Sequence, residues 1–221
     1  MTWTPQRMRF GTFMAPFHKD VVNPTLALER DLELVQLLDS LTFDEAWVGE
    51  HHSGAYECIA SPELFLATAA ERTKHIKLAT GVSSVSYHHP LVLADRICQL
   101  DHQTRGRVIF GVGPGQLVAD AYMMGIDPAV LRDRLEEALE VLVPLMNGEV
   151  VTHKTDWFEL SEARVHIRPY QSPRMEMCVA SAISPTGART AGRFGLGMLA
   201  VAASSPAGFK QLANHWQICE E

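Results

Sequence analysis

Hydrophobic residues along this chain form short continuous runs that alternate with stretches in which they recur at helical spacing. Short apolar runs predict buried strands, and we expect these at residues 8–14, 46–48, 76–83, 107–112, 175–180 and 197–202. Apolar residues at helical spacing predict helices between the strands, at residues 23–42, 61–73, 90–103, 127–146, 186–194 and 206–219. Strands that alternate with helices indicate an α/β fold built on a parallel sheet. We expect three tryptophans to be core or packing residues: Trp47, Trp157 and Trp216.

Residues 149–170 interrupt this rhythm, because their apolar and polar positions alternate as in a β-hairpin. We interpret them as an insertion. The rest of the chain holds about six β/α units, whereas a TIM (β/α)8 barrel typically needs about 250 residues. With 221 residues, we expect a TIM-type barrel that is incomplete, forming a single domain over residues 1–221 and truncated at the C-terminus. Such a chain is either a fragment or a naturally incomplete barrel.

The composition is that of an ordinary globular protein, with 47% hydrophobic and 20% charged residues. The net charge is −7 and the basic residues are scattered, so there is no footprint for nucleic acid. No apolar stretch approaches the roughly 20 residues that span a membrane, and the N-terminus lacks the apolar core of a signal peptide. The four cysteines form no CxxC pair, so we expect free, mostly buried thiols and a cytoplasmic protein.

The strongest chemical signal is the stretch FDEAWVGEHH, residues 43–52. A buried strand that ends on ionisable residues is typical of an active site at the mouth of a barrel. Histidine exchanges protons near neutral pH, and neighbouring strand residues point to opposite faces. We therefore predict His51 as the catalytic residue, with Glu50 as the partner that fixes its ring. The alternative is a packed, hydrogen-bonded pair of His51 and His52 at a strand end.

A second histidine pair follows the third strand, in Tyr87-His88-His89-Pro90. Together with Glu50 these histidines could suggest a metal site. Sequence-adjacent ligands seldom converge on one ion, and no HxH or HxxxH spacing is present, so we predict no metal. Residues 81–84 (GVSS) are small and polar, which would let a flat ring lie against the backbone; the alternative is a tightly packed strand end.

Two further loops carry residues suited to a ligand. The glycines of Gly111-Val112-Gly113-Pro114-Gly115 allow close approach of the backbone, but the spacing does not match a nicotinamide fingerprint. Residues 181–188 (SAISPTGA) offer hydroxyl groups and a helix N-terminus to an anion such as phosphate, and Arg134 is the cation we direct to it. Simple capping by Ser or Thr is the alternative interpretation of that loop.

Taken together, these stretches resemble the luciferase-like family of flavin-dependent monooxygenases, and within it the limonene 1,2-monooxygenase-type branch. The resemblance rests on FDEAWVGEHH, IKLATGVSSVSYHHP, RVIFGVGPG and VASAISPTGART in this order. It implies a TIM barrel that binds reduced FMN supplied by a separate flavin reductase. It also implies that O2 adds to the flavin and that the resulting peroxyflavin oxygenates a small apolar substrate such as a terpene, in a homodimer.

The resemblance also assigns residues. His51 matches the active-site histidine, and Ser83-Ser84 match the place of a non-proline cis peptide beneath the flavin ring. Gly113 stands where luciferase has a reactive cysteine, so no thiol role carries over. The residues expected to bind the cofactor are Ser83, Ser84, Gly113, Arg134, Ser181, Ser184, Thr186, Gly187 and Ala188.

Three other functions stay open at the level of the sequence. One is hydride transfer by a deazaflavin-dependent oxidoreductase of the same superfamily. Another is a non-catalytic flavin-binding module made from a shortened barrel. The third is a metal-dependent hydrolase built on the histidine pairs.

Overall fold

The computed structural model describes residues 7–15, 17–19, 22–54 and 57–221. Its main sheet is parallel and runs in the order β1-β2-β3-β5-β8-β9, and the two-residue β4 pairs with β5. The strands of this sheet are β1 (Gly11–Met14), β2 (Glu45–Val48), β3 (Lys77–Thr80), β4 (Ser83–Ser84), β5 (Val108–Gly113), β8 (Met177–Ser181) and β9 (Gly197–Ala200). The prediction of a parallel sheet of six strands that alternate with helices is confirmed.

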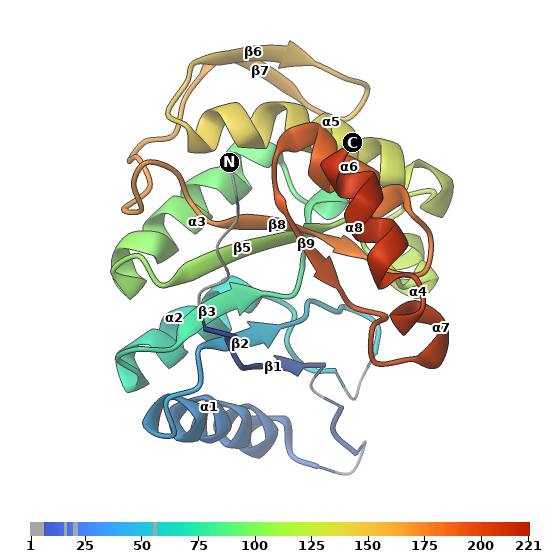
Figure 1. Ribbon diagram of the computed structural model, residues 1–221. Helices are drawn as coiled ribbons and strands as arrows, with labels where there is room; N and C mark the ends of the chain where they lie inside the picture. Colours follow the sequence, from blue (N-terminus) through green and yellow to red (C-terminus); the bar gives the residue numbers. More distant parts are fainter. Residues whose placement is uncertain (1–6, 16, 20–21, 55–56) are drawn as a thin grey trace.

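Helices connect successive strands and cover the outer face of the sheet (Figure 1). They are α1 (Pro24–Ser40), α2 (Pro62–Arg72), α3 (Pro90–Thr104), α4 (Val118–Met123), α5 (Leu131–Met146), α6 (Thr186–Phe194), α7 (Pro206–Phe209) and α8 (Leu212–Glu220), with 3-10 turns η1 (Val85–Tyr87) and η2 (Pro128–Val130). Asn23 caps α1 by accepting a hydrogen bond from Thr25 N–H over 2.9 Å. The sequence did not predict α4, and the single helix expected over residues 206–219 is divided into α7 and α8.

The six strands curve into a half-barrel, which confirms the expected incomplete TIM-type architecture. In the part of the chain that the structure describes, β1 and β9 end the path and do not pair with each other. Because the strands are parallel, their carboxyl ends all lie at one rim. Loops that follow the strands therefore meet there.

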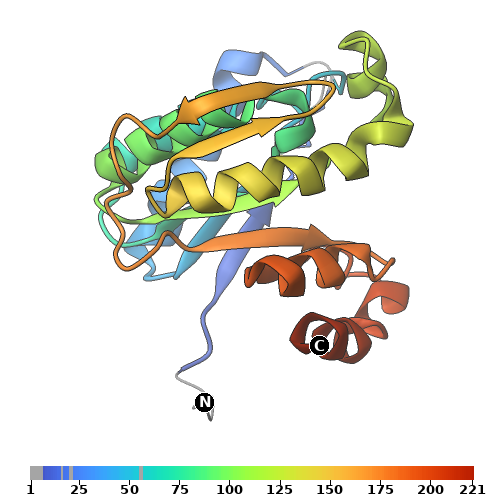
Figure 2. The ribbon, with the colours of Figure 1, turned by 90° about the horizontal axis from the view of Figure 1, so that it is seen from above.

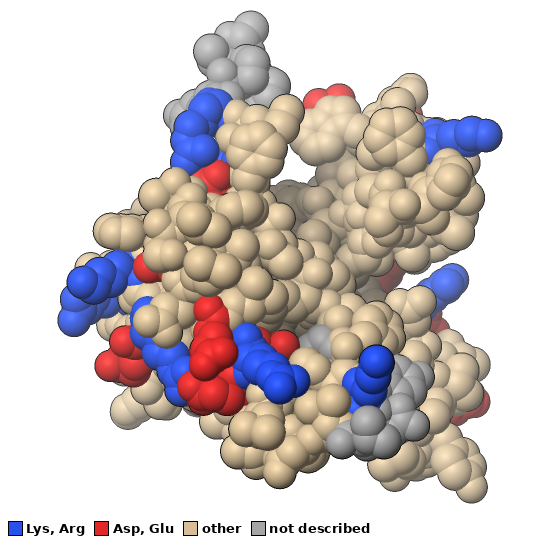
Figure 3. Space-filling model, turned by 90° about the horizontal axis from the view of Figure 1, so that it is seen from below, with Lys and Arg blue, Asp and Glu red and all other residues tan. Residues whose placement is uncertain are grey.

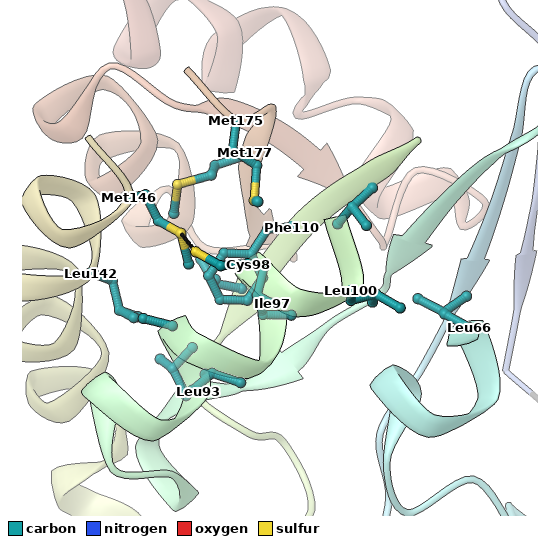
Figure 4. Packing of buried hydrophobic residues seen from close by; sticks show 14 of the residues in the cluster. Leu66, Leu93, Ile97, Cys98, Leu100, Phe110, Leu142, Met146, Met175 and Met177 are labelled. Carbon is teal, nitrogen blue, oxygen red and sulfur yellow. Dashed lines mark hydrogen bonds between the residues drawn. The ribbon is translucent and has the colours of Figure 1, made fainter. Parts of the chain in front are cut away.

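The main core lies between the sheet and the covering helices. Outward-facing strand residues such as Leu78 and Phe110 are buried in it. Figure 4 shows side chains of α3 and α5 meeting those of β5, where the Cys98 thiol lies 3.7 Å from the sulfur of Met146. Burial raises the pKa of the Cys98 thiol to about 12, and the nearby Asp95 and Asp101 add to the effect. All four cysteines are free; two are buried and two half-buried.

The inner face of the half-barrel carries a small second cluster of Ala79, Ile109 and Cys178, with Trp47 and Leu199 against it. A cavity of about 660 Å3 opens on this face towards the amino ends of the strands, where its lining includes Arg9 and Glu176. Figure 3, seen from below, shows a hollow between the body of the molecule and the lobe of C-terminal helices. This cavity thus opens at the rim opposite to the carboxyl ends.

The predicted insertion is an antiparallel hairpin of β6 (Val151–Lys154) and β7 (Glu159–Ala163), as expected. It lies along the outer side of α5 (Figure 2). Trp157 in its turn is half-buried and donates to Glu137 over 2.5 Å. The prediction that Trp216 is a core or packing residue is wrong, because the residue is 57% exposed.

Candidate active site

Glu50 ties together the loops that follow β2 and β3. Its Oε1 accepts hydrogen bonds from His52 Nε2 over 2.8 Å and from His88 Nε2 over 2.9 Å. Its Oε2 accepts from the backbone N–H of Ser84 over 2.8 Å. The residue is only 4% exposed. A buried carboxylate with three donors is held in one orientation.

These partners set the charge of the cluster. Burial alone would raise the pKa of Glu50, but the hydrogen bonds from His52 and His88, the charge of His88 and the Ser84 N–H together lower it to about 2. The hydrogen bond to Glu50 raises the pKa of His52; burial opposes this, and the charges of Glu50 and Asp120 reinforce it. Glu50 is therefore an anion at neutral pH.

His51 has other partners than the sequence suggested. Its Nε2 lies 3.3 Å from Glu57 Oε2, and its Nδ1 lies 3.7 Å from Asp120 Oδ2. The expectation that Glu50 fixes the His51 ring is wrong. Side chains two positions apart share a face of an extended chain, so Glu50 meets His52, and His51 turns to the opposite side.

Asp120, like Glu57, is a site residue that the sequence analysis missed. It lies on α4, is 1% exposed, and its Oδ1 accepts from the backbone N–H of His52 over 3.2 Å. The sequence feature that could have identified Asp120 is a single carboxylate among the apolar residues 117–124 (LVADAYMM), soon after the glycine loop. Asp120 thus faces both histidines of the pair.

Three buried polar atoms at this rim have no hydrogen-bond partner among the described residues: His51 Nδ1, Ser83 Oγ and Tyr87 OH. Burial, with the charges of Asp120 and Glu50, raises the pKa of Tyr87 to about 12, so its phenol is a neutral donor at neutral pH. The cis peptide that the resemblance placed at Ser83-Ser84 lies instead between Gly81 and Val82.

The other predicted cofactor residues lie on neighbouring strands and helices. Gly113 ends β5 and pairs with Ser84 of β4. Ser181 ends β8, and its hydroxyl faces His215 Nδ1 at 3.3 Å. Ser184, Thr186, Gly187 and Ala188 form the turn into α6 and its first residues, with Ser184 Oγ 3.5 Å from Thr186 Oγ1.

Arg134 lies on the first turns of α5. Its guanidinium sits over the ring of Trp157, 5.1 Å from the centroid, an arrangement that stabilises a cation. Its predicted contact with a phosphate is not tested by this arrangement and stays a prediction.

The sequence pattern of one family, described as Luciferase-like monooxygenase, matches residues 8–219. The chain belongs to the luciferase-like monooxygenase family. The resemblance inferred from the sequence is therefore confirmed. Limonene 1,2-monooxygenase of Rhodococcus erythropolis is 51% identical over 215 residues, which make up 97% of this chain and 55% of that protein. The chain thus spans little more than half the length of this relative.

Solved structures show the same fold. Monooxygenase RslO1 from Streptomyces bottropensis has a TM-score of 0.87 at 28% identity, covering 96% of this chain and 66% of that one. A type II Baeyer–Villiger monooxygenase, the oxygenating constituent of 3,6-diketocamphane monooxygenase from Pseudomonas putida, was solved in complex with FMN. Its TM-score is 0.83 at 24% identity, over 97% of this chain and 62% of that one.

The rim of this luciferase-like chain fits a flavin. A flavin ring carries donors and acceptors along its edge, and the unpartnered Ser83 and Tyr87 hydroxyls and His51 Nδ1 are buried groups that need such partners. The turn into α6 presents hydroxyls beside a helix N-terminus, a site suited to phosphate.

No group of three or more His, Cys, Asp or Glu side chains among the described residues is arranged to hold a metal ion. None of the described helices is both long and apolar enough to cross a membrane.

Proposed function

We propose that this protein is a monooxygenase that uses reduced FMN and O2 to oxygenate a small apolar substrate such as a terpene. The observation that carries the proposal is His51, held between the buried carboxylates of Glu57 and Asp120 at the carboxyl rim. The 51% identity to a limonene monooxygenase supports the substrate class. The FMN in the related diketocamphane enzyme supports the cofactor.

The chain offers separate groups to the two ends of the cofactor. Ser83 and Ser84, with Gly113 of the neighbouring strand, would lie against the ring. The phosphate would be held by hydroxyl and N–H groups of the turn into α6; the residues proposed for it are Ser181, Ser184, Thr186, Gly187 and Ala188, with Arg134. Bound reduced FMN would supply the electrons that activate O2.

His51 would manage protons beside the ring. Glu57 carboxylate, 3.3 Å from Nε2, favours a hydrogen on that nitrogen. Nδ1 is then free to accept a proton, and Asp120 Oδ2 at 3.7 Å would stabilise the resulting cation. Glu50 would act indirectly, because it holds His52 and the Ser84 backbone and does not hold the His51 ring.

The partners follow from the same proposal. A separate flavin reductase would supply the reduced FMN, and we propose a homodimer in the cytoplasm. The free thiols of all four cysteines fit a reducing compartment.

The test is oxygenation of limonene by the protein supplied with FMN, a flavin reductase and NADH under 18O2. The proposal predicts one 18O atom in the product and no product without FMN. Unlabelled product, or none while FMN is bound, would contradict it. Reduction of a substrate by a reduced deazaflavin without O2 would favour the hydride-transfer alternative.

A further inference from the structure

Helix α8 buries one side chain, and that side chain is a histidine. His215 is 1% exposed, with Nδ1 3.3 Å from Ser181 Oγ and Nε2 3.2 Å from the carbonyl oxygen of Ile183. A carbonyl oxygen only accepts, so Nε2 carries the hydrogen and donates it to Ile183. In the tautomer with its hydrogen on Nε2, Nδ1 accepts the hydrogen of the Ser181 hydroxyl. Both nitrogens of this ring are used by one loop.

That loop is the turn between β8 and α6. Residues 182–184 are exposed, so few side-chain contacts hold the turn in place. The first hydrogen bond at the start of α6 runs from Arg189 N–H to Pro185 O over 3.0 Å. The N–H groups just before it, on Thr186, Gly187 and Ala188, therefore belong to the open end of the helix, where an anion binds.

Helix α8 is itself fixed against α6. A Cβ on Gly192 of α6 would lie 2.4 Å from the carbonyl oxygen of Cys219 in α8, so the two backbones touch. Figures 1 and 2 show these helices side by side. The His215 imidazole thus belongs to α8, which packs on α6, and the N-terminal end of α6 would contact the phosphate.

We propose that His215 is a positioning residue of the phosphate site, a step that rests on the proposed FMN function. By holding Ser181 and Ile183, it sets the course of the turn so that Ser184, Thr186 and the end of α6 converge on a phosphate monoester. Ser181 acts through this geometry, because its hydroxyl is paired with His215 Nδ1. His215 itself does not contact the ligand.

FMN and riboflavin separate this role from general stability, because they share the ring and differ only in the phosphate. Both affinities are measured by quenching of flavin fluorescence. His215→Ala leaves the Ile183 carbonyl unpaired, so FMN binding should weaken about tenfold while riboflavin binding stays within about twofold. His215→Gln keeps a donor for Ile183 and should restore FMN affinity to within about threefold of the wild type. Trp216→Ala, next along the helix but exposed, is the control that should change neither affinity.

The ratio of FMN to riboflavin affinity in the variants decides whether His215 positions the phosphate site. An unchanged ratio of FMN to riboflavin affinity in His215→Ala overturns the inference, and so does an equal loss for both flavins. If His215→Ala does not fold by circular dichroism, His215→Asn takes its place under the same criterion, because its amide is too short to reach Ile183. Wild-type protein that binds neither flavin would overturn the proposed function itself. If the wild type binds FMN but His215→Ala has the same ratio of FMN to riboflavin affinity, only the role of His215 is overturned.

Discussion

The carboxylate of Glu50 and the imidazole of His88 are 2.9 Å apart although 38 positions separate them in the chain. Because Glu50 also holds His52 and the Ser84 N–H, one side chain joins the loop after β2 to the segment after β3. The rim that we propose for the flavin depends on this connection.

Glu50→Ala should lower the free energy of unfolding by about 2–4 kcal/mol, because the buried Ser84 N–H and the half-buried rings of His52 and His88 lose their acceptor. Urea unfolding at neutral pH measures the difference. Glu149→Ala, at an exposed position, is the matched control and should stay within about 0.5 kcal/mol of the wild type. Equal effects of the two substitutions would show that the Glu50 cluster does not stabilise the fold.

The same cluster predicts a pH dependence. The pKa of Glu50 falls from its ordinary 4.5 to about 2 in the folded protein, so its stabilisation is complete above 4.5 and is lost as the pH falls towards 2. The pKa of His52 is raised above its ordinary 6.5, so its stabilisation is complete below 6.5 and is lost as the pH rises through the raised value. The stability difference between wild type and Glu50→Gln should therefore be largest between these limits.

Urea unfolding of both proteins at about pH 3, 5.5 and 8.5 checks this, with the middle value expected to give the largest difference. A difference that is constant over the three values would contradict the ion-pair account. Because only the difference between the two proteins is used, other titrating groups cancel.

The sequence was sufficient for the succession of strands and helices along the chain, because apolar runs and helical periods record burial directly. It also located the rim residues, since parallel strands bring their ends together. It could not give the partners of His51, because Glu57 and Asp120 reach it through loops and through α4, a six-residue helix with no clear period. His215 was likewise missed, since a histidine within an amphipathic helix carries no signal of the loop that it will contact.

His51→Ala should separate catalysis from binding. If His51 moves protons beside the ring, product formation should fall by about 100-fold or more, while the FMN dissociation constant changes less than about threefold. Labelled product and fluorescence titration give the two values. His75→Ala, an exposed histidine before β3, is the control, and a similar loss of product in both variants would refute the role of His51.

Gly111→Ala should disturb the sheet on which the rim is built. A Cβ there would lie 2.0 Å from the carbonyl oxygen of Thr80 in β3, so the strands must separate, at a cost of about 1–3 kcal/mol in the free energy of unfolding. Gly49→Ala has its nearest neighbour at 3.6 Å and should be tolerated. Thermal unfolding that ranks the two variants in the opposite order would contradict the close strand contact.

We propose that the flavin binds at the carboxyl rim and not in the large cavity at the amino ends of the strands. Hydrogen–deuterium exchange with and without FMN tests it most directly. We predict that FMN slows exchange in residues 81–84, 113–116 and 183–188, and leaves residues 174–177 beside the cavity unchanged. Protection of residues 174–177 without protection of 183–188, or no protection at all, would contradict the account.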